Sequence, residues 1–128
     1  MCTLIIDAAN EKIFLMIIKS TNIYKASFEN SKTNYERLTI LIDDFLNLNN
    51  LKINDISKLY VNRGPGSFAG IRNSLSVVKA INLVKNIDYY CFSFKDFGDV
   101  NNIEYENIPN LCDKFKIKKN LINPIYIS

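Results

Sequence analysis

The part of this sequence that could most readily do chemistry is a glycine-rich run between a predicted strand and a predicted helix. It reads Arg63-Gly64-Pro65-Gly66-Ser67-Phe68-Ala69-Gly70-Ile71-Arg72. Glycine tolerates backbone conformations that other residues avoid, and the free amides at a helix N-terminus attract anions. The run could therefore hold a phosphate group, or it could be a tight turn that starts a helix.

The known phosphate-binding patterns fit this run poorly. A P-loop is excluded because no Gly-Lys-Ser/Thr follows the glycines. The spacing Gly64-x-Gly66-x-x-Ala69 matches a relaxed dinucleotide-binding pattern, but Pro65 lacks an amide donor. That pattern also occurs in the first strand–helix unit of its fold, whereas three strands and a helix precede the glycine run here. The acidic residue expected about 20 residues after the glycines would be Asp96, which lies farther along the chain than that. A helix-starting turn is favoured, and a nucleotide site stays the alternative.

The composition removes several classes of enzyme site. No histidine is present, which excludes Ser-His-Asp and Cys-His sites and a histidine general base. Cys2, Cys91 and Cys112 are far apart, so we expect reduced, buried thiols in a cytoplasmic protein. The N-terminal segment lacks the basic start of a signal peptide, and no stretch reaches the ~20 uncharged residues that span a bilayer. The net charge of +3 does not by itself indicate nucleic acid or a membrane partner.

Hydrophobic periodicity places the glycine run in a series of seven elements. Strands are predicted at residues 3–8, 12–19, 23–28, 58–62 and 89–94, and helices at residues 33–48 and 67–86. The order β-β-β-α-β-α-β is that of one ribonuclease-H-like or actin-like (ASKHA) lobe, an α/β fold with a mixed five-stranded sheet. We expect this lobe to cover residues 1–95. Residues 96–128 are predicted to be a short C-terminal tail packed over the lobe, too small for a second core.

Both predicted helices carry more apolar surface than one sheet can cover. On the first, Tyr35 and Leu46 widen the apolar stripe to roughly 160°, where ~100° would suffice. The second carries two apolar stripes, one of Phe68, Ile71, Leu75 and Val78, the other of Val77, Ala80, Ile81 and Val84. We therefore predict that the sheet covers one side of the second helix and that the first helix or a partner protein covers the other.

The glycine run closely resembles the Gly-x-Gly-Pro-Gly-Ser-Phe-Thr-Gly-Leu-Arg signature of the TsaB (YeaZ) family, with Asn62 for a small residue and Ala69 for Thr. Residues 4–9 are similar to the family's Ile-x-Ile-Asp-Thr-Ser opening without its hydroxyl residues, and residues 33–42 resemble its first helix. Residues 123–127, which end in Tyr126-Ile127, resemble its Pro-x-Tyr-Leu-Arg ending. The matching motif positions are Asp7, Gly64, Pro65, Gly66, Ser67, Phe68, Gly70 and Arg72. The sequence is identified as a shortened member in which a tail stands where relatives carry a second lobe.

The resemblance implies a function as well as a fold. TsaB proteins are similar in fold to the catalytic subunit TsaD, which implies that this chain is a non-catalytic scaffold that binds TsaD. It would support threonylcarbamoyl transfer to the adenosine beside the anticodon of certain tRNAs, with the ATPase TsaE in the same assembly and only indirect contact with tRNA. No catalytic, cofactor-binding or metal-binding residue is expected. A homodimer through the helices would form when TsaD is absent.

Asp7 is the residue that the wider superfamily connects with a cofactor. Relatives that bind ATP between two lobes often place a metal- or phosphate-associated aspartate on this strand, which would make Asp7 a magnesium ligand. Magnesium needs several oxygen ligands and usually substrate phosphates, and here the following hydroxyl residues and the second lobe are missing. A carboxylate that caps backbone amides is favoured. A small nucleotide-binding enzyme that uses Asp7 and the Gly64-Pro65-Gly66 loop is the alternative function.

In the family the two N-terminal lobes meet through their helices, which agrees with the two-sided apolar helices predicted here. The candidate interface residues are Leu38, Leu41, Phe45, Val77, Ile81 and Val84, and core packing is the default role of each. The lysine-rich run at residues 114–119 is interpreted as a solvated, charged edge rather than as a tRNA contact.

Overall fold

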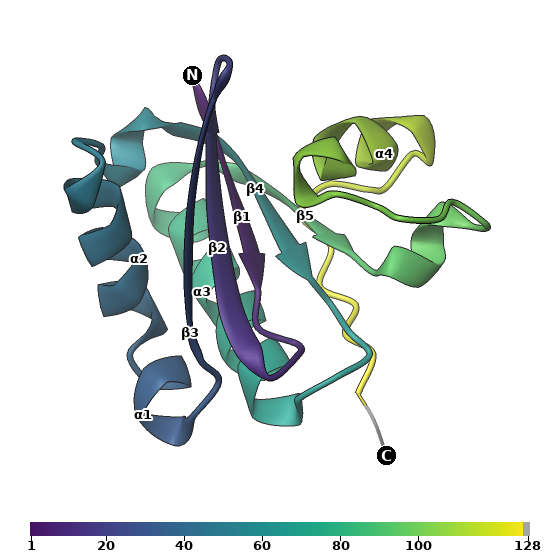
Figure 1. Cartoon of the computed structure of the whole chain (residues 1–128), viewed down its shortest axis with the longest axis horizontal. Helices are drawn as coiled ribbons and strands as arrows, with labels where there is room; N and C mark the ends of the chain where they lie inside the picture. Colours follow the sequence, from purple (N-terminus) through teal and green to yellow (C-terminus); the bar gives the residue numbers. More distant parts are fainter. Residues whose placement is uncertain (127–128) are drawn as a thin grey trace.

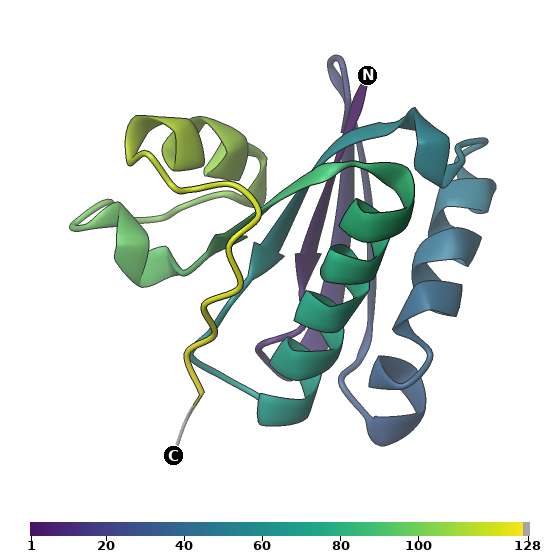
Figure 2. The ribbon, with the colours of Figure 1, turned by 180° about the vertical axis from the view of Figure 1, so that it is seen from behind.

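A mixed β-sheet runs through the centre of the protein, with two helices on one face and residues 94–117 on the other (Figures 1 and 2). β1 (Cys2–Asp7), β2 (Lys12–Lys19) and β3 (Asn22–Glu29) form the predicted antiparallel meander, whereas β4 (Ile56–Asn62) and β5 (Asp88–Phe92) extend the sheet in parallel with β1. The strand order is β3-β2-β1-β4-β5. The predicted α/β architecture with a mixed five-stranded sheet is confirmed.

The computed structural model describes residues 1–126. Ile127, the last position of the ending that resembles TsaB, lies outside the described residues. In the described part of the chain, no helix is long and apolar enough to cross a membrane. The three cysteines are free and buried, as predicted. Burial raises the pKa of the Cys91 and Cys112 thiols to about 12, so both stay protonated and unreactive at neutral pH.

β1 is buried on both of its faces. Successive side chains of a strand point to opposite faces, so Leu4 and Ile6 join the core on the helical side while Ile5 joins a second cluster on the other side. A strand that is covered on both faces reads as a continuous apolar run rather than as an alternating pattern, which explains the Leu-Ile-Ile sequence. The sheet therefore needs a cover on each face.

α2 (Leu38–Leu48) and α3 (Phe68–Lys85) cover the first face of the sheet. Ile71, Leu75 and Val78 of α3 are at most 4% exposed and form its inner stripe. The second predicted stripe of this helix is only partly buried, because α2 packs beside α3 and leaves part of that stripe uncovered. The prediction that the second helix carries apolar side chains on two sides, with the sheet covering one of them, is thus confirmed.

The single helix predicted over residues 33–48 is wrong, because the chain forms two helices there, α1 (Lys32–Tyr35) and α2. The side-chain amide of Asn34 donates to the Glu29 carbonyl at 2.9 Å and ties the first turn to the end of β3. The chain then bends at Arg37, whose φ of −110° and ψ of 22° are not helical. The bend lets Tyr35 and Leu46 contact the same core. The additional apolar side chains of this helical region are therefore largely buried within the chain.

The first part of the C-terminal segment, residues 94–117, covers the second face of the sheet (Figure 1). It contains the 3-10 helices η2 (Phe94–Phe97) and η3 (Tyr105–Asn107) and the short helix α4 (Ile108–Lys114), which the sequence did not predict. Phe97 and Ile108 are fully buried and pack in one cluster with Ile5 of β1. The tail thus shares its apolar cluster with the sheet and forms no separate core.

Phe97 supplies the first test of this packing. We expect Phe97→Ala to lower the free energy of unfolding by about 3–4 kcal/mol, because it leaves a cavity between tail and sheet. Phe68→Ala is the matched control, since Phe68 is 53% exposed, and it should cost no more than about 1 kcal/mol. Urea denaturation followed by circular dichroism measures both, and equal losses would show that the tail is not part of the cooperative unit.

Candidate functional site

Gly66 and Gly70 bring the start of α3 into direct contact with the end of β1. A Cβ atom on Gly66 would overlap the carbonyl oxygen of Ala9, and one on Gly70 would overlap that of Ala8. Glycine is needed at both positions because any side chain would push the helix away from the strand. These two glycines therefore act as packing residues at the joint between α3 and β1.

Ser67 makes this joint polar as well as close. Its amide donates to the Ala9 carbonyl at 2.8 Å, and its hydroxyl oxygen accepts from the Gly70 amide at 3.2 Å as the N-cap of α3. The Ser67 amide is therefore used within the chain, and its hydroxyl oxygen caps the helix. The predicted helix-starting turn is confirmed, with α3 beginning at Phe68.

Gly64 and Arg63 join the same loop to the C-terminal segment. Gly64 has a φ of +110°, and a Cβ atom there would overlap the Ile125 carbonyl. The Arg63 guanidinium donates to the Asp96 carboxylate at 2.6 and 3.2 Å and to the Asn123 carbonyl at 3.0 Å. Arg63 thus holds two parts of the tail against the end of β4. Sequence reasoning missed this role, because both partners are distant along the chain.

Asp7 is 1% exposed, and both of its carboxylate oxygens are used in hydrogen bonds. One oxygen accepts from the Ala9 amide at 3.1 Å, which confirms the predicted capping role. The other accepts from the Tyr105 hydroxyl at 2.6 Å, a partner 98 residues away that the sequence did not indicate. Burial and the negative charge of Asp7 raise the pKa of Tyr105 well above its usual value, so its hydroxyl remains a donor.

The surroundings of Asp7 do not fit a magnesium ion. Its oxygens are satisfied by Ala9 and Tyr105, and among residues 1–126 no three acidic or cysteine side chains gather as ligands. An open cavity of about 950 Å³ lies beside the glycine loop, lined in part by Lys12, Ser67 and Tyr105. Asp7 is not among the residues that line it.

The last two motif residues are on the surface. Phe68 is half exposed and its ring contacts that of Tyr126, with centroids 4.6 Å apart, while Arg72 is exposed on the next turn of α3. The motif is therefore spread over several environments. Its glycines, Ser67 and Asp7 hold the fold together, and Arg72 is exposed to solvent or a partner.

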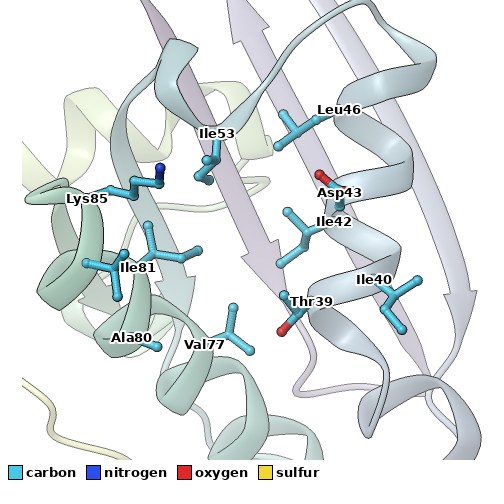
Figure 3. Close-up of a pocket in the computed structure, with 11 residues that line it drawn as sticks. Thr39, Ile40, Ile42, Asp43, Leu46, Ile53, Val77, Ala80, Ile81 and Lys85 are labelled. Atoms are coloured by element: carbon cyan, nitrogen blue, oxygen red, sulfur yellow. The ribbon is translucent and has the colours of Figure 1, made fainter.

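A second candidate site is an apolar groove of about 400 Å³ between α2 and α3 (Figure 3). Ile42 and Leu46 form part of the α2 wall, and Val77 and Ile81 face them from α3. Asp43 and Lys85 stand on opposite sides as the charged lining residues. The full lining is Thr39, Ile40, Ile42, Asp43, Leu46, Ile53, Val77, Ala80, Ile81, Val84 and Lys85.

The predicted interface residues divide between the core and this groove. Leu38, Leu41 and Phe45 are 1%, 8% and 4% exposed and pack against the sheet, so the expectation that they contribute exposed apolar surface is wrong. The helix turns these three residues inward because its inner stripe must cover the sheet. The other three line the groove: Val77 and Ile81 are partly buried, and Val84 is 78% exposed.

A protein-family model describes the part of the chain that contains both helices of the groove. The model of TsaD, tRNA N6-adenosine threonylcarbamoyltransferase, matches residues 28–93, just over half of the chain. The chain belongs to this family. The match to the TsaD family includes the glycine loop, whereas Asp7 and the tail lie outside it. No curated protein sequence matches the chain.

Solved structures share the fold of this TsaD-family chain. YeaZ from Pseudomonas aeruginosa superposes with a TM-score of 0.66 at 18% identity, over 72% of this chain and 43% of YeaZ, and a protein described as similar to peptidase YeaZ from Pseudomonas aeruginosa gives the same values. Thermus thermophilus RuvC in complex with a Holliday junction substrate gives 0.52 at 10% identity, over 76% of this chain and 67% of RuvC. The predicted ribonuclease-H-like or ASKHA-type lobe is confirmed, and so is the TsaB (YeaZ) recognition at the level of the TsaD family and the YeaZ fold. The chain spans less than half the length of the YeaZ structures that it matches.

The joint between α3 and β1 makes a direct prediction. We expect Gly70→Ala to lower the free energy of unfolding by about 2 kcal/mol, because the overlap with the Ala8 carbonyl outweighs the ~1 kcal/mol gained in helix propensity. Ser76→Ala, at an exposed position of the same helix, should leave stability unchanged or slightly raised. Thermal denaturation distinguishes them, and a stabilised Gly70→Ala variant would refute the role given to this glycine.

The Tyr105–Asp7 hydrogen bond predicts a dependence of stability on pH. The pKa of Tyr105 is raised in the folded state, so its contribution is complete below the unfolded value of about 10 and is lost as the pH rises above it. Tyr105→Phe should cost about 1–2 kcal/mol at neutral pH, since it leaves a buried carboxylate with one hydrogen bond fewer.

Chemical denaturation of both proteins between pH 7 and about pH 11 checks this. The difference between wild type and Tyr105→Phe should shrink above about pH 10. Tyr24→Phe is the control, because the Tyr24 hydroxyl makes no hydrogen bond within residues 1–126. A constant difference across the whole range would contradict the prediction.

Proposed function

We propose that this TsaD-family chain is a non-catalytic cytoplasmic subunit that binds a TsaD catalytic subunit and so supports formation of threonylcarbamoyladenosine in tRNA. The observation that carries the proposal is the apolar groove between α2 and α3, in a chain whose matched region contains both helices. TsaE would join the same assembly, and the chain would contact tRNA only indirectly.

The groove has the properties of a docking surface. Val84 and Ile40 are 78% and 49% exposed, and burying such side chains contributes roughly 25 cal/mol for each Å² of apolar area. Asp43 on α2 and Lys85 on α3 have opposite charges, which would fix the orientation of a partner more than its affinity. A partner that offers an apolar helix with the complementary charges would satisfy both features.

A TsaD subunit suits this groove because its own lobe has the same general fold. Two lobes of one fold can pack through equivalent helices around a pseudo-twofold axis, so that each fills the groove of the other. The sequence resemblance to TsaB proteins implies this arrangement, in which the lobes meet through their helices. The same geometry allows a homodimer when TsaD is absent.

The non-catalytic part of the proposal rests on the polar groups around the glycine loop. Asp7, Ser67 and Arg63 are each engaged by partners within the chain, and the sequence contains no histidine. The open cavity beside the loop is the feature that favours the alternative, a small nucleotide-binding enzyme. Calorimetry with ATP and Mg²⁺ separates the two: saturable binding that Asp7→Ala weakens would support the enzyme.

Binding to TsaD should depend on Val84. We expect Val84→Asp to weaken binding of the TsaD from the same genome by at least about tenfold, because the carboxylate would be buried against apolar side chains. Leu83→Asp is a matched control, since Leu83 is 74% exposed on the adjacent position and does not line the groove. It should leave the affinity unchanged.

Co-purification and calorimetry with wild type and both variants measure this effect, with melting temperatures to verify that each variant folds. Loss of binding in Leu83→Asp but not in Val84→Asp would place the interface elsewhere on α3. Failure of two folded wild-type proteins to associate would overturn the proposal as a whole.

A further inference from the structure

A polar pocket of about 410 Å³ lies on the opposite face of the sheet from the groove. It is bounded by β4 and β5 on one side and by α4 and the following loop, residues 109–119, on the other. We call it the α4 pocket. Its volume is within the range of pockets that hold small ligands. Neither the family motif nor the proposed TsaD interface uses it.

Positive charge is concentrated around the α4 pocket. Lys58 of β4 and Lys116 and Lys119 of the tail all line it, against a single acidic lining residue, Asp113. Lys119 also approaches Asp88 at 3.5 Å, but both side chains are well exposed, so this pair holds the ammonium only weakly. The fold thus brings together cations that are more than fifty residues apart in the sequence.

Two tyrosines form the wall of the pocket on the sheet. Tyr60 and Tyr90 are neighbours on β4 and β5, and their rings stack with centroids 5.0 Å apart. Tyr60 is only 4% exposed, yet in the described part of the chain the Tyr105 hydroxyl is the one tyrosine hydroxyl with a protein hydrogen-bond partner. The hydroxyl oxygen is not among the enclosed polar atoms that lack a partner, and Tyr60 lines the pocket, so the ring is buried while the hydroxyl stays accessible to a ligand.

The Tyr60 hydroxyl is protonated at neutral pH. Burial raises its pKa well above the usual value for tyrosine, with smaller contributions from Cys112, Tyr90 and Asp113. The hydroxyl therefore stays neutral and can donate a hydrogen bond. The pocket offers one neutral O–H donor and three ammonium groups, which together suit a tetrahedral anion with several acceptor oxygens better than a carboxylate with two.

We propose that the α4 pocket binds a phosphate group, carried by an RNA backbone or by a free nucleotide, through Lys58, Lys116, Lys119 and the Tyr60 hydroxyl. Lysine binds phosphate as a point charge, and a positive pocket with low-dielectric walls increases the local concentration of anions. Lys116 and Lys119, which belong to the lysine-rich run at residues 114–119, would therefore contact a phosphate rather than only solvent. The inference is independent of TsaD binding, because groove and pocket lie on opposite faces of the sheet.

The decisive experiment titrates the full chain with three probes: inorganic phosphate, AMP and a fluorescein-labelled ten-nucleotide single-stranded RNA. We expect saturable binding of at least one probe, weakened about three- to tenfold by Tyr60→Phe. The melting temperature of Tyr60→Phe should not fall, since the Tyr60 hydroxyl has no hydrogen-bond partner among residues 1–126 to lose. A residue with a purely structural role would change stability and leave affinity alone.

Two lysine variants complete the test, Lys116→Asn in the pocket and Lys79→Gln outside it. Lys116 has a φ of +55°, which asparagine tolerates, so Lys116→Asn removes the charge without straining the backbone. We expect about tenfold weaker binding and, for RNA, a salt dependence reduced by about one phosphate contact. Lys79→Gln, at an exposed position on α3, is the matched control and should bind like wild type.

The outcomes separate the two sources of phosphate. RNA that binds at least about tenfold more tightly than AMP, with strong salt dependence, assigns the pocket to an RNA backbone; equal affinities assign it to a nucleotide. Either result supports the proposal. It is overturned if no probe saturates, if Tyr60→Phe binds like wild type, or if Lys79→Gln weakens binding as much as Lys116→Asn does.

Discussion

The close contact between the start of α3 and the end of β1 is the constraint on which the rest of this structure depends. Gly66 and Gly70 leave no space for a side chain between the helix and the carbonyls of Ala8 and Ala9, and Ser67 bonds across the same joint. A helix held this closely at one end has its direction fixed. That direction sets the position of α3 beside α2, and with it the shape of the apolar groove.

The second constraint is the burial of β1 on both faces. An apolar strand in the middle of a sheet exposes hydrophobic surface on whichever side lacks a cover. Helices cover one face, and the tail covers the other through Phe97, Ile108 and its polar ties to Arg63 and Asp7. These ties add polar contacts to the apolar packing that holds the segment in place.

The fold therefore separates two surfaces of different chemistry. The groove between α2 and α3 is apolar with opposite charges in its lining, which suits a protein partner. The α4 pocket, on the other face of the sheet, is cationic and hydroxyl-lined, which suits phosphate. Because the sheet lies between them, each surface can be occupied without displacing the ligand of the other.

The sequence by itself determined the five strands with their boundaries to within one or two residues, the position of α3 and the turn at Ser67, because periodicity and cap chemistry are local. It also predicted that α3 is apolar on two sides. It did not show that the first helical region divides into α1 and α2. Only the tertiary structure decided that Leu38, Leu41 and Phe45 face the sheet, since a stripe wider than one contact does not show which half turns inward. The pairing of Asp7 with Tyr105, the Arg63 ties and the α4 pocket join residues distant along the chain. No local pattern records such contacts, because they form only when the tail folds back across the sheet.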